Sequence, residues 1–235
     1  EVIMGQRLVL LGSDEIALPT FEALRTLPEI EIVAVYSQPD RPSGRGQELR
    51  PNPVAAWAKS HQLLLRQPEK LLPEHAVELK NDQVALGVVM AYGQILKEDF
   101  LAAPRLGLVN LHGSLLPALR GATPVEAALA LGLKTTGVSL QQVVRALDAG
   151  PLHGSSEVAV VAEDDRVSLR ARLGVVGAEL MLRCLPKILA QQSTPQPQDA
   201  SRVTFTRRLL RTDAPLDFKA SATTLSQRIK ALSGW

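Results

Sequence analysis

The sequence has few aromatic residues, one cysteine and no long apolar run, and each scarcity excludes a class of protein. Aromatic side chains make up 3% of the 235 residues, which argues against base stacking as a main mode of binding and against a large aromatic interface. The single cysteine, Cys184, excludes a disulfide framework and a multi-cysteine metal site, and it fits a reducing compartment such as the cytoplasm. No run reaches the roughly 18 apolar residues of a membrane span, so we expect no membrane partner.

Neither sign of charge dominates the chain as a whole. The formal net charge is +2, which by itself argues against a strongly basic nucleic-acid binder. Residues 201–235 hold seven basic and two acidic side chains, net +5, whereas the preceding residues hold 19 basic and 22 acidic side chains, net −3. The four histidines have no metal-ligand spacing, and we expect no metal site.

Short apolar runs alternate with helix-length amphipathic segments in the first 190 residues. Such runs are typical of parallel strands covered on both faces, and their alternation with helices indicates right-handed βαβ units. The sequence therefore predicts an α/β fold, an open Rossmann-like and mostly parallel sheet with helices on both faces. We expect strands at residues 7–11, 31–36, 84–90, 106–111, 137–143 and 157–161, and helices near 19–27, 54–60, 73–80, 124–131 and 165–190.

Polar residues that follow the apolar runs are the candidates for a functional site, because ligands bind beyond the carboxyl ends of the strands in open α/β sheets. Asn110 and His112 are two residues apart, so on a strand their side chains project from one face. An amide donor beside an imidazole suits acyl transfer, in which the amide stabilises an oxyanion and the imidazole moves protons. A structural histidine at a strand end is the other interpretation of this pattern.

Asp148 and three further loops are weaker candidates. Asp148 precedes a Gly-Pro turn, and it would complete an Asn, His and Asp set only if it lay near His112. Residues 38–47, with their two arginines, form either a solvated loop or a flap that contacts phosphate. Residues 91–96 could present backbone groups to a flat heterocycle. The Gly12-Ser13 turn lacks the glycine pattern of a dinucleotide site.

The run HGSLLPALRGATP at 112–124, with Asn110 before it and DAGP at 148–151 after it, resembles the folate-dependent formyltransferase family. Within that family, QPDRPSGRG at 38–46 and AYGQIL at 91–96 are most similar to the members that formylate methionyl-tRNA. The likeness covers residues 5–235 in order. It implies the transfer of a formyl group from 10-formyltetrahydrofolate to the α-amine of methionyl initiator tRNA during translation initiation.

The resemblance also implies a role for each motif and a monomeric protein. Asn110 and His112 would stabilise the oxyanion, and Asp148 would hold His112 in its working protonation state. The residues implied in folate binding are Ser114, Leu115, Leu116 and Pro117 along the pocket, with Gln94, Ile95 and Leu96 offering backbone groups to the pterin. The residues implied in tRNA binding are Arg41, Arg45, Arg207 and Arg208.

A polar, proline-containing stretch after Ala190 divides the chain. We expect residues 1–190 to form the catalytic domain, residues 191–204 an exposed linker, and residues 205–235 the start of a second domain. This last segment is too short to fold without a partner, so we expect more of a second domain to follow it. The resemblance implies that this domain is a C-terminal β-barrel that binds tRNA.

Two other functions remain open from the sequence. A sugar-nucleotide N-formyltransferase or a formyltetrahydrofolate hydrolase would share the same Asn, His and Asp set on the same fold. A non-catalytic folate- or nucleotide-binding module would keep the pocket without that set. The arginine-containing loop and the basic C-terminal segment favour tRNA over a nucleotide sugar as the acceptor.

Overall fold

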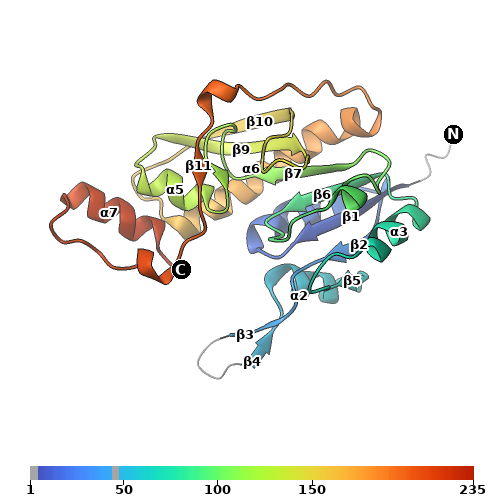
Figure 1. Cartoon of the computed structure of the whole chain (residues 1–235), viewed down its shortest axis with the longest axis horizontal. Coiled ribbons are helices and arrows are strands. Elements are labelled where there is room, and N and C mark those ends of the chain that lie inside the picture. The colour runs from blue at the N-terminus through green and yellow to red at the C-terminus, as the bar shows by residue number, and fades with distance from the viewer. Residues whose placement is uncertain (1–4, 44–47) are drawn as a thin grey trace.

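The computed structural model describes residues 5–43 and 48–235, and within them seven strands form one mixed sheet (Figure 1). The neighbours β7, β6, β1, β2 and β5 are parallel, while β9 and β10 add antiparallel at the β7 edge. This arrangement confirms the mostly parallel α/β sheet. Its strands are β1 (Gln6–Gly12), β2 (Ile30–Tyr36), β5 (Leu65–Arg66), β6 (Leu86–Met90), β7 (Leu108–His112), β9 (Thr135–Gln142) and β10 (Leu152–Ala159).

Two small ribbons lie outside this sheet. The hairpin of β3 (Arg41–Ser43) and β4 (Glu48–Arg50) projects from the β2 side of the molecule (Figure 1). The other ribbon joins β8 (Arg120–Gly121) in parallel to β11 (Phe205–Thr206), which is distant in the sequence.

Helices cover both faces of the sheet, as expected. They are α1 (Leu18–Arg25), α2 (Pro53–Ser60), α3 (Pro73–Asn81), α4 (Glu98–Leu101), α5 (Pro124–Ala130), α6 (Arg166–Leu189) and α7 (Ala222–Ala231), with 3-10 turns η1 (Glu15–Ala17), η2 (Ala200–Arg202) and η3 (Arg211–Asp213). Apolar side chains of α1, α2, α5 and α6 share one core cluster with the sheet, and those of α3 and α4 share another on the opposite face. Leu, Val and Ala dominate both clusters, and the scarce aromatics Phe21, Tyr36 and Phe100 are fully buried within them.

Helix α6 is the long helix that the sequence predicts at 165–190. Asp165 caps it, accepting a hydrogen bond from the Ser168 backbone while the Ser168 hydroxyl accepts one from the Asp165 backbone. Its leucines at the expected positions are buried: Leu169, Leu173, Leu180 and Leu185.

Partly buried ion pairs join α6 to α5 and to the turn after β1. The Arg170 guanidinium lies 2.7 Å from an oxygen of Asp14 and 3.2 Å from one of Glu126. Arg166 contacts the same Glu126 oxygen at 2.8 Å. Since buried charges are costly without partners, these contacts fix how the helices meet the sheet.

The chain after α6 returns along the first domain instead of leaving it. It runs back past β10, where Gln196 forms an isolated bridge with Leu152, and then descends as β11 (Figure 1), which pairs with β8. Helix α7 then packs against α5. The boundaries expected at residues 190 and 204 stay a prediction, but the segment that they delimit contacts the sheet domain along much of its length.

In the part of the chain that the structure describes, no helix is both long enough and apolar enough to cross a membrane.

We predict that Gly12→Ala destabilises the fold by about 1–3 kcal/mol, because overpacking a filled site forces neighbours apart. An added Cβ would lie 2.8 Å from a Phe21 ring carbon and 2.9 Å from the Met90 carbonyl oxygen. Gly177→Ala in α6 is the matched control, since the nearest atom to its Cβ would be 3.6 Å away. Urea denaturation should show no loss of stability for the control and a lower midpoint for Gly12→Ala. Equal midpoints would contradict the packing argument.

Candidate active site

The polar residues of the site share the face of the sheet over β7 and β9. Strand alternation sends Val109 and Leu111 into the larger core cluster, so Asn110 and His112 face the opposite side. The antiparallel pairing sets Gln141 opposite Asn110 and Ser139 opposite His112. The side chains of α3 and α4 pack farther along this face, and the loop after β7 covers the β7 and β9 part instead.

His112 is held at both ring nitrogens and is 6% exposed. Its Nε2 lies 2.9 Å from the Leu119 carbonyl oxygen, which can only accept, so Nε2 carries the proton in the neutral ring. Its Nδ1 lies 3.7 Å from Asp148 Oδ2. Nδ1 therefore faces a carboxylate oxygen across a gap longer than a hydrogen bond.

Asp148 reaches this position through a loop that folds back over the sheet. Its backbone adopts φ +47, in the left-handed region. Its Oδ2 accepts a hydrogen bond from the Gly121 backbone at 2.8 Å, and its Oδ1 accepts one from the Gln141 side chain at 2.9 Å. The sequence alone leaves the distance between Asp148 and His112 open, and the structure brings the two side chains together.

Gln141 is the residue of this site that the sequence analysis missed. It is buried, its Nε2 holds Asp148, and its Oε1 has no hydrogen-bond partner among the described residues. The signal that would identify it is its register opposite Asn110, which depends on the pairing of two strands distant in the sequence.

The loop after His112 is fixed by its own polar groups and by β9. The Ser114 hydroxyl donates to the Ala118 carbonyl at 2.6 Å, and the Ser139 hydroxyl donates to the Ser114 carbonyl and accepts from the Leu116 backbone. Leu115 and Pro117 are partly buried beside the buried Leu116. The four residues implied in folate binding therefore form one ordered wall next to His112, in which the Ser114 hydroxyl is already engaged.

The 91–96 loop follows β6, which neighbours β7, at the same edge of the sheet. Hydrogen bonds from the Ser13 hydroxyl and the Gln38 amide hold the Tyr92 carbonyl, and burial raises the pKa of the Tyr92 phenol. Ile95 is 92% exposed. Within the described residues, no backbone hydrogen bond uses the N–H or C=O groups of Gln94, Ile95 or Leu96. These groups are therefore available to a ligand.

The arginines expected at tRNA are placed unequally. Arg41 lies on β3 with its side chain 70% exposed, 3.9 Å from Glu69, while Arg45 lies outside the described residues. Arg207 forms two hydrogen bonds with Asp213, at 2.6 and 2.8 Å, and these lower the pKa of that carboxyl. Arg208 is exposed.

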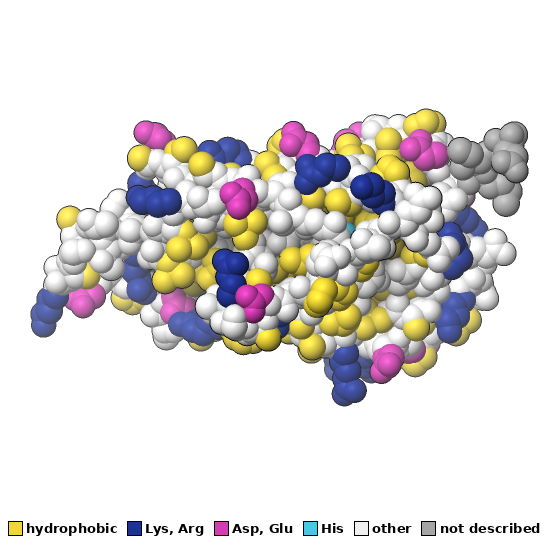
Figure 2. Space-filling model, turned by 90° about the horizontal axis from the view of Figure 1, so that it is seen from above, with side chains coloured by type: hydrophobic (Ala, Val, Ile, Leu, Met, Phe, Trp, Pro, Cys, Tyr) yellow, Lys and Arg dark blue, Asp and Glu magenta, His cyan; other side chains and the backbone are white. Residues whose placement is uncertain are grey.

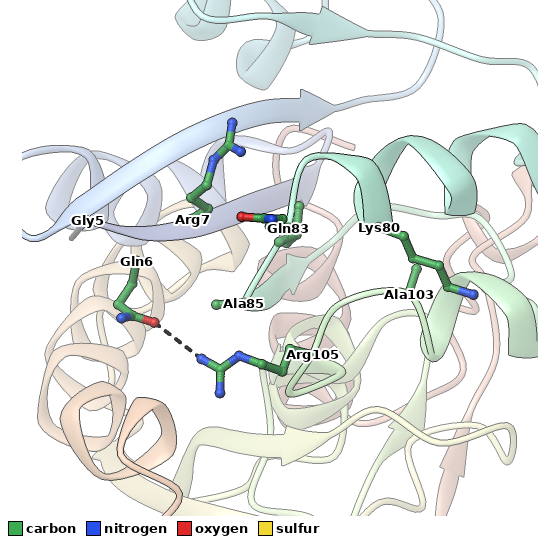
Figure 3. Close-up of a pocket in the computed structure, with 9 residues that line it drawn as sticks. Gly5, Gln6, Arg7, Lys80, Gln83, Ala85, Ala103 and Arg105 are labelled. Carbon is green, nitrogen blue, oxygen red and sulfur yellow. Dashed lines mark hydrogen bonds between the residues drawn. The ribbon is translucent and has the colours of Figure 1, made fainter.

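A cavity of about 520 Å³ lies at the amino ends of β1, β6 and β7, on the edge opposite His112. Arg7, Lys80 and Arg105 line it, but Figure 3 shows the Arg7 and Lys80 side chains extending in different directions. Because its cations do not converge on one point, we do not assign a site there. The described residues also contain no cluster of three or more His, Cys, Asp or Glu side chains that could hold a metal.

Comparison with known proteins assigns the chain to a class that matches this fold. The family model described as formyl transferase matches residues 7–185. The crystal structure of the N-formyltransferase from Helicobacter canadensis, in complex with folinic acid and dTDP-3-aminofucose, superposes with a TM-score of 0.74 at 18% identity, covering 97% of this chain and 80% of that one. The chain belongs to the formyl transferase family and is a formyltransferase.

Two similar relatives within this family are methionyl-tRNA formyltransferases. Those of Methylococcus capsulatus and Halorhodospira halophila are each 41% identical over 230 residues. The alignments cover 97% and 98% of this chain, respectively, and 74% of each relative.

We predict that Gln141→Leu lowers kcat for formyl transfer about ten-fold with little change in KM, because loss of a positioning contact misplaces a reacting group. The variant keeps the volume of the side chain and removes the hydrogen bond to Asp148. Gln142→Leu is the control, since Gln142 bonds to His153 and Leu106 instead. The measurement is steady-state kinetics of both variants. Equal kcat values for Gln141→Leu and Gln142→Leu would contradict this role.

Proposed function

We propose that this chain transfers the formyl group of 10-formyltetrahydrofolate to the α-amine of methionyl initiator tRNA. The observation that carries the proposal is the convergence of His112 and Asp148, 3.7 Å apart, on the face that Asn110 shares. The similarity to methionyl-tRNA formyltransferases over nearly the whole chain supports this choice of acceptor. We expect the protein to act as a monomer in the cytoplasm.

In the proposed reaction the amine nitrogen attacks the formyl carbon, and the carbonyl oxygen becomes negatively charged. The Asn110 amide donates a hydrogen bond to that oxygen, and the His112 imidazolium adds positive charge beside it. Asp148 stabilises the imidazolium and assists removal of the proton that the amine loses. The bond from the formyl carbon to N10 then breaks, N10 takes up a proton, and tetrahydrofolate leaves.

The folate has two candidate surfaces in this proposal. The unpaired backbone groups of residues 94–96 suit the donor and acceptor edge of a pterin, and the wall formed by residues 114–117 is bonded to Ser139 of β9, next to β7. Both surfaces sit at the carboxyl edge of the parallel strands, the usual ligand edge of such sheets.

The tRNA would be held mainly through phosphate contacts. Figure 2 shows basic and acidic side chains interspersed over one face of the molecule, without a continuous basic surface. We assign the binding to arginines because guanidinium groups pair with phosphate. The exposed aromatics Phe205, Phe218 and Trp235 are too few to hold the tRNA mainly by stacking. Arg41 and Arg208 suit this role better than Arg207, which Asp213 already neutralises.

We predict that His112→Ala and Asp148→Asn each lower kcat for methionyl-tRNA formylation by about a hundred-fold or more, as is typical of losing an acid, a base or an oxyanion donor. The measurement is transfer of labelled formyl from 10-formyltetrahydrofolate. A variant that kept a rate near that of the wild type would refute the catalytic assignment of its residue.

The same assay distinguishes the acceptors. We expect charged initiator tRNA to be formylated, nucleotide-sugar amines to remain unmodified, and hydrolysis of the folate without an acceptor to be slow. Preference for the nucleotide sugar, or rapid hydrolysis, would replace the proposed function with one of its alternatives.

We predict that Arg41→Ala and Arg208→Ala raise KM for methionyl-tRNA and leave the Kd for folate unchanged. In each variant the slope of log K for tRNA binding against log salt concentration should become shallower by about one. Arg207→Ala should have a smaller effect because its charge is paired with Asp213. Arg105→Ala, at the opposite edge of the sheet, is the control. A weakened folate Kd in the Arg41 variant would overturn its assignment to tRNA.

A further inference from the structure

The segment from Gln196 to Thr206 contacts the two loops that hold His112 and Asp148. It follows the part of the chain that the family model matches, which ends at residue 185. From composition alone it is a polar connection between domains, yet the side chains of Gln198, Thr204 and Thr206 bond directly to the loops of the candidate active site.

Gln198 joins the Asp148 turn to the loop after His112. Its Nε2 donates to the carbonyl oxygens of Asp148 and Gly150, each at 2.8 Å. Its Oε1 accepts from the Arg120 guanidinium, at 2.7 Å from Nη2 and 3.1 Å from Nε. Both ends of this one side chain are therefore used, and together they fix the distance between the two loops.

Thr204 holds the residue whose carbonyl fixes His112. Its hydroxyl accepts a hydrogen bond from the Leu119 backbone at 2.8 Å, and its carbonyl accepts one from the Arg120 backbone at 2.9 Å. Leu119 has φ +59, a left-handed conformation that is strained for a branched side chain and persists only where neighbouring contacts enforce it. The Leu119 carbonyl in turn accepts from His112 Nε2.

The pairing of β11 with β8 completes this contact. It brings Thr206 so close to Gly121 that a Cβ on Gly121 would lie 2.1 Å from the Thr206 carbonyl oxygen. The Gly121 backbone N–H is the group that donates to Asp148 Oδ2. The segment thus touches the partner of each catalytic side chain: Leu119 for His112, and Gly121 for Asp148.

We propose that Gln198 and Thr204 are positioning residues of the active site, which set the relative placement of His112 and Asp148 through Leu119, Arg120 and the Asp148 turn. The inference rests on the proposed function, because formyl transfer is the reaction that this placement serves. It makes the segment after α6 a structural part of the catalytic centre and not only a connection.

The test compares Gln198→Ala and Thr204→Val with two matched variants. Gln196→Ala removes a glutamine from the same segment whose side chain bonds only to the Thr194 carbonyl. Thr204→Ser keeps the hydroxyl that Leu119 donates to. Each protein is assayed for kcat and KM with 10-formyltetrahydrofolate and methionyl-tRNA, and for amide hydrogen exchange of the peptide that contains residues 119–121.

We expect Gln198→Ala and Thr204→Val to lower kcat about ten-fold at unchanged KM, as small misplacements of reacting groups do, and to accelerate exchange in that peptide. Gln196→Ala and Thr204→Ser should match the wild type in both measurements. Such a split between kcat and KM, with rescue by serine, is not expected of residues that only stabilise the fold.

Three outcomes would overturn the proposal. Unchanged exchange in both test variants would mean that the loops do not depend on these side chains. Faster exchange with unchanged kcat would mean that the placement has no catalytic consequence. Equal losses in Gln196→Ala would assign the effect to the segment in general. If the wild type fails to formylate methionyl-tRNA, the proposed function is wrong, and hydrogen exchange still decides whether Gln198 and Thr204 hold the loops.

Discussion

The antiparallel pairing of β7 with β9 is the constraint on which the site depends. It sets Asn110 opposite Gln141 and His112 opposite Ser139, so four polar side chains share one face. A shift of the pairing register by one residue would turn these polar side chains into the core and the apolar side chains between them toward the loops. The residues that prevent this shift are the alternate ones, buried on the opposite face: Val109, Leu111, Val138 and Leu140. The hydrophobic effect thus fixes the register that the chemistry requires.

Polar groups buried beneath the loops are stable only because nearly all of them have partners. An unpaired buried donor or acceptor costs about 1–3 kcal/mol, so the contacts of Asp148, His112 and Ser139 are needed for stability as well as for orientation. The same bonds restrict the loops to one arrangement. Stability and the placement of the proposed catalytic groups therefore have a common origin in this part of the molecule.

Much of the fold could be predicted because its main elements carry local signals. Apolar runs identified the longer strands, and the 3.6-residue period with an Asp cap identified α6. The hairpin β3–β4, the two-residue strands and the four-residue α4 escaped prediction, since short elements have too few residues to show a period. The ten-residue α7 also escaped prediction. The spacing of two positions from Asn110 to His112 was enough to place both side chains on one face of β7.

The remainder of the site depends on contacts between distant residues. Nothing near Asp148 in the sequence indicates that its turn folds back to His112, and Gln141 and Gln198 are ordinary polar residues until the pairing is known. Charge counting likewise identified a basic C-terminal segment, but it could not distinguish Arg207, paired with Asp213, from Arg208.

The late position of Gln198 and Thr204 in the chain has a consequence for biosynthesis. Every strand of the main sheet precedes residue 160, whereas Thr204 bonds to a residue 85 positions before it. A ribosome therefore delivers the whole sheet, with His112 on β7 and Asp148 in the turn between β9 and β10, before it delivers the segment that contacts their loops. If Gln198 and Thr204 position the site as proposed, its geometry is completed only after α6 and about fifteen further residues have left the exit tunnel, so activity follows the folding of the sheet.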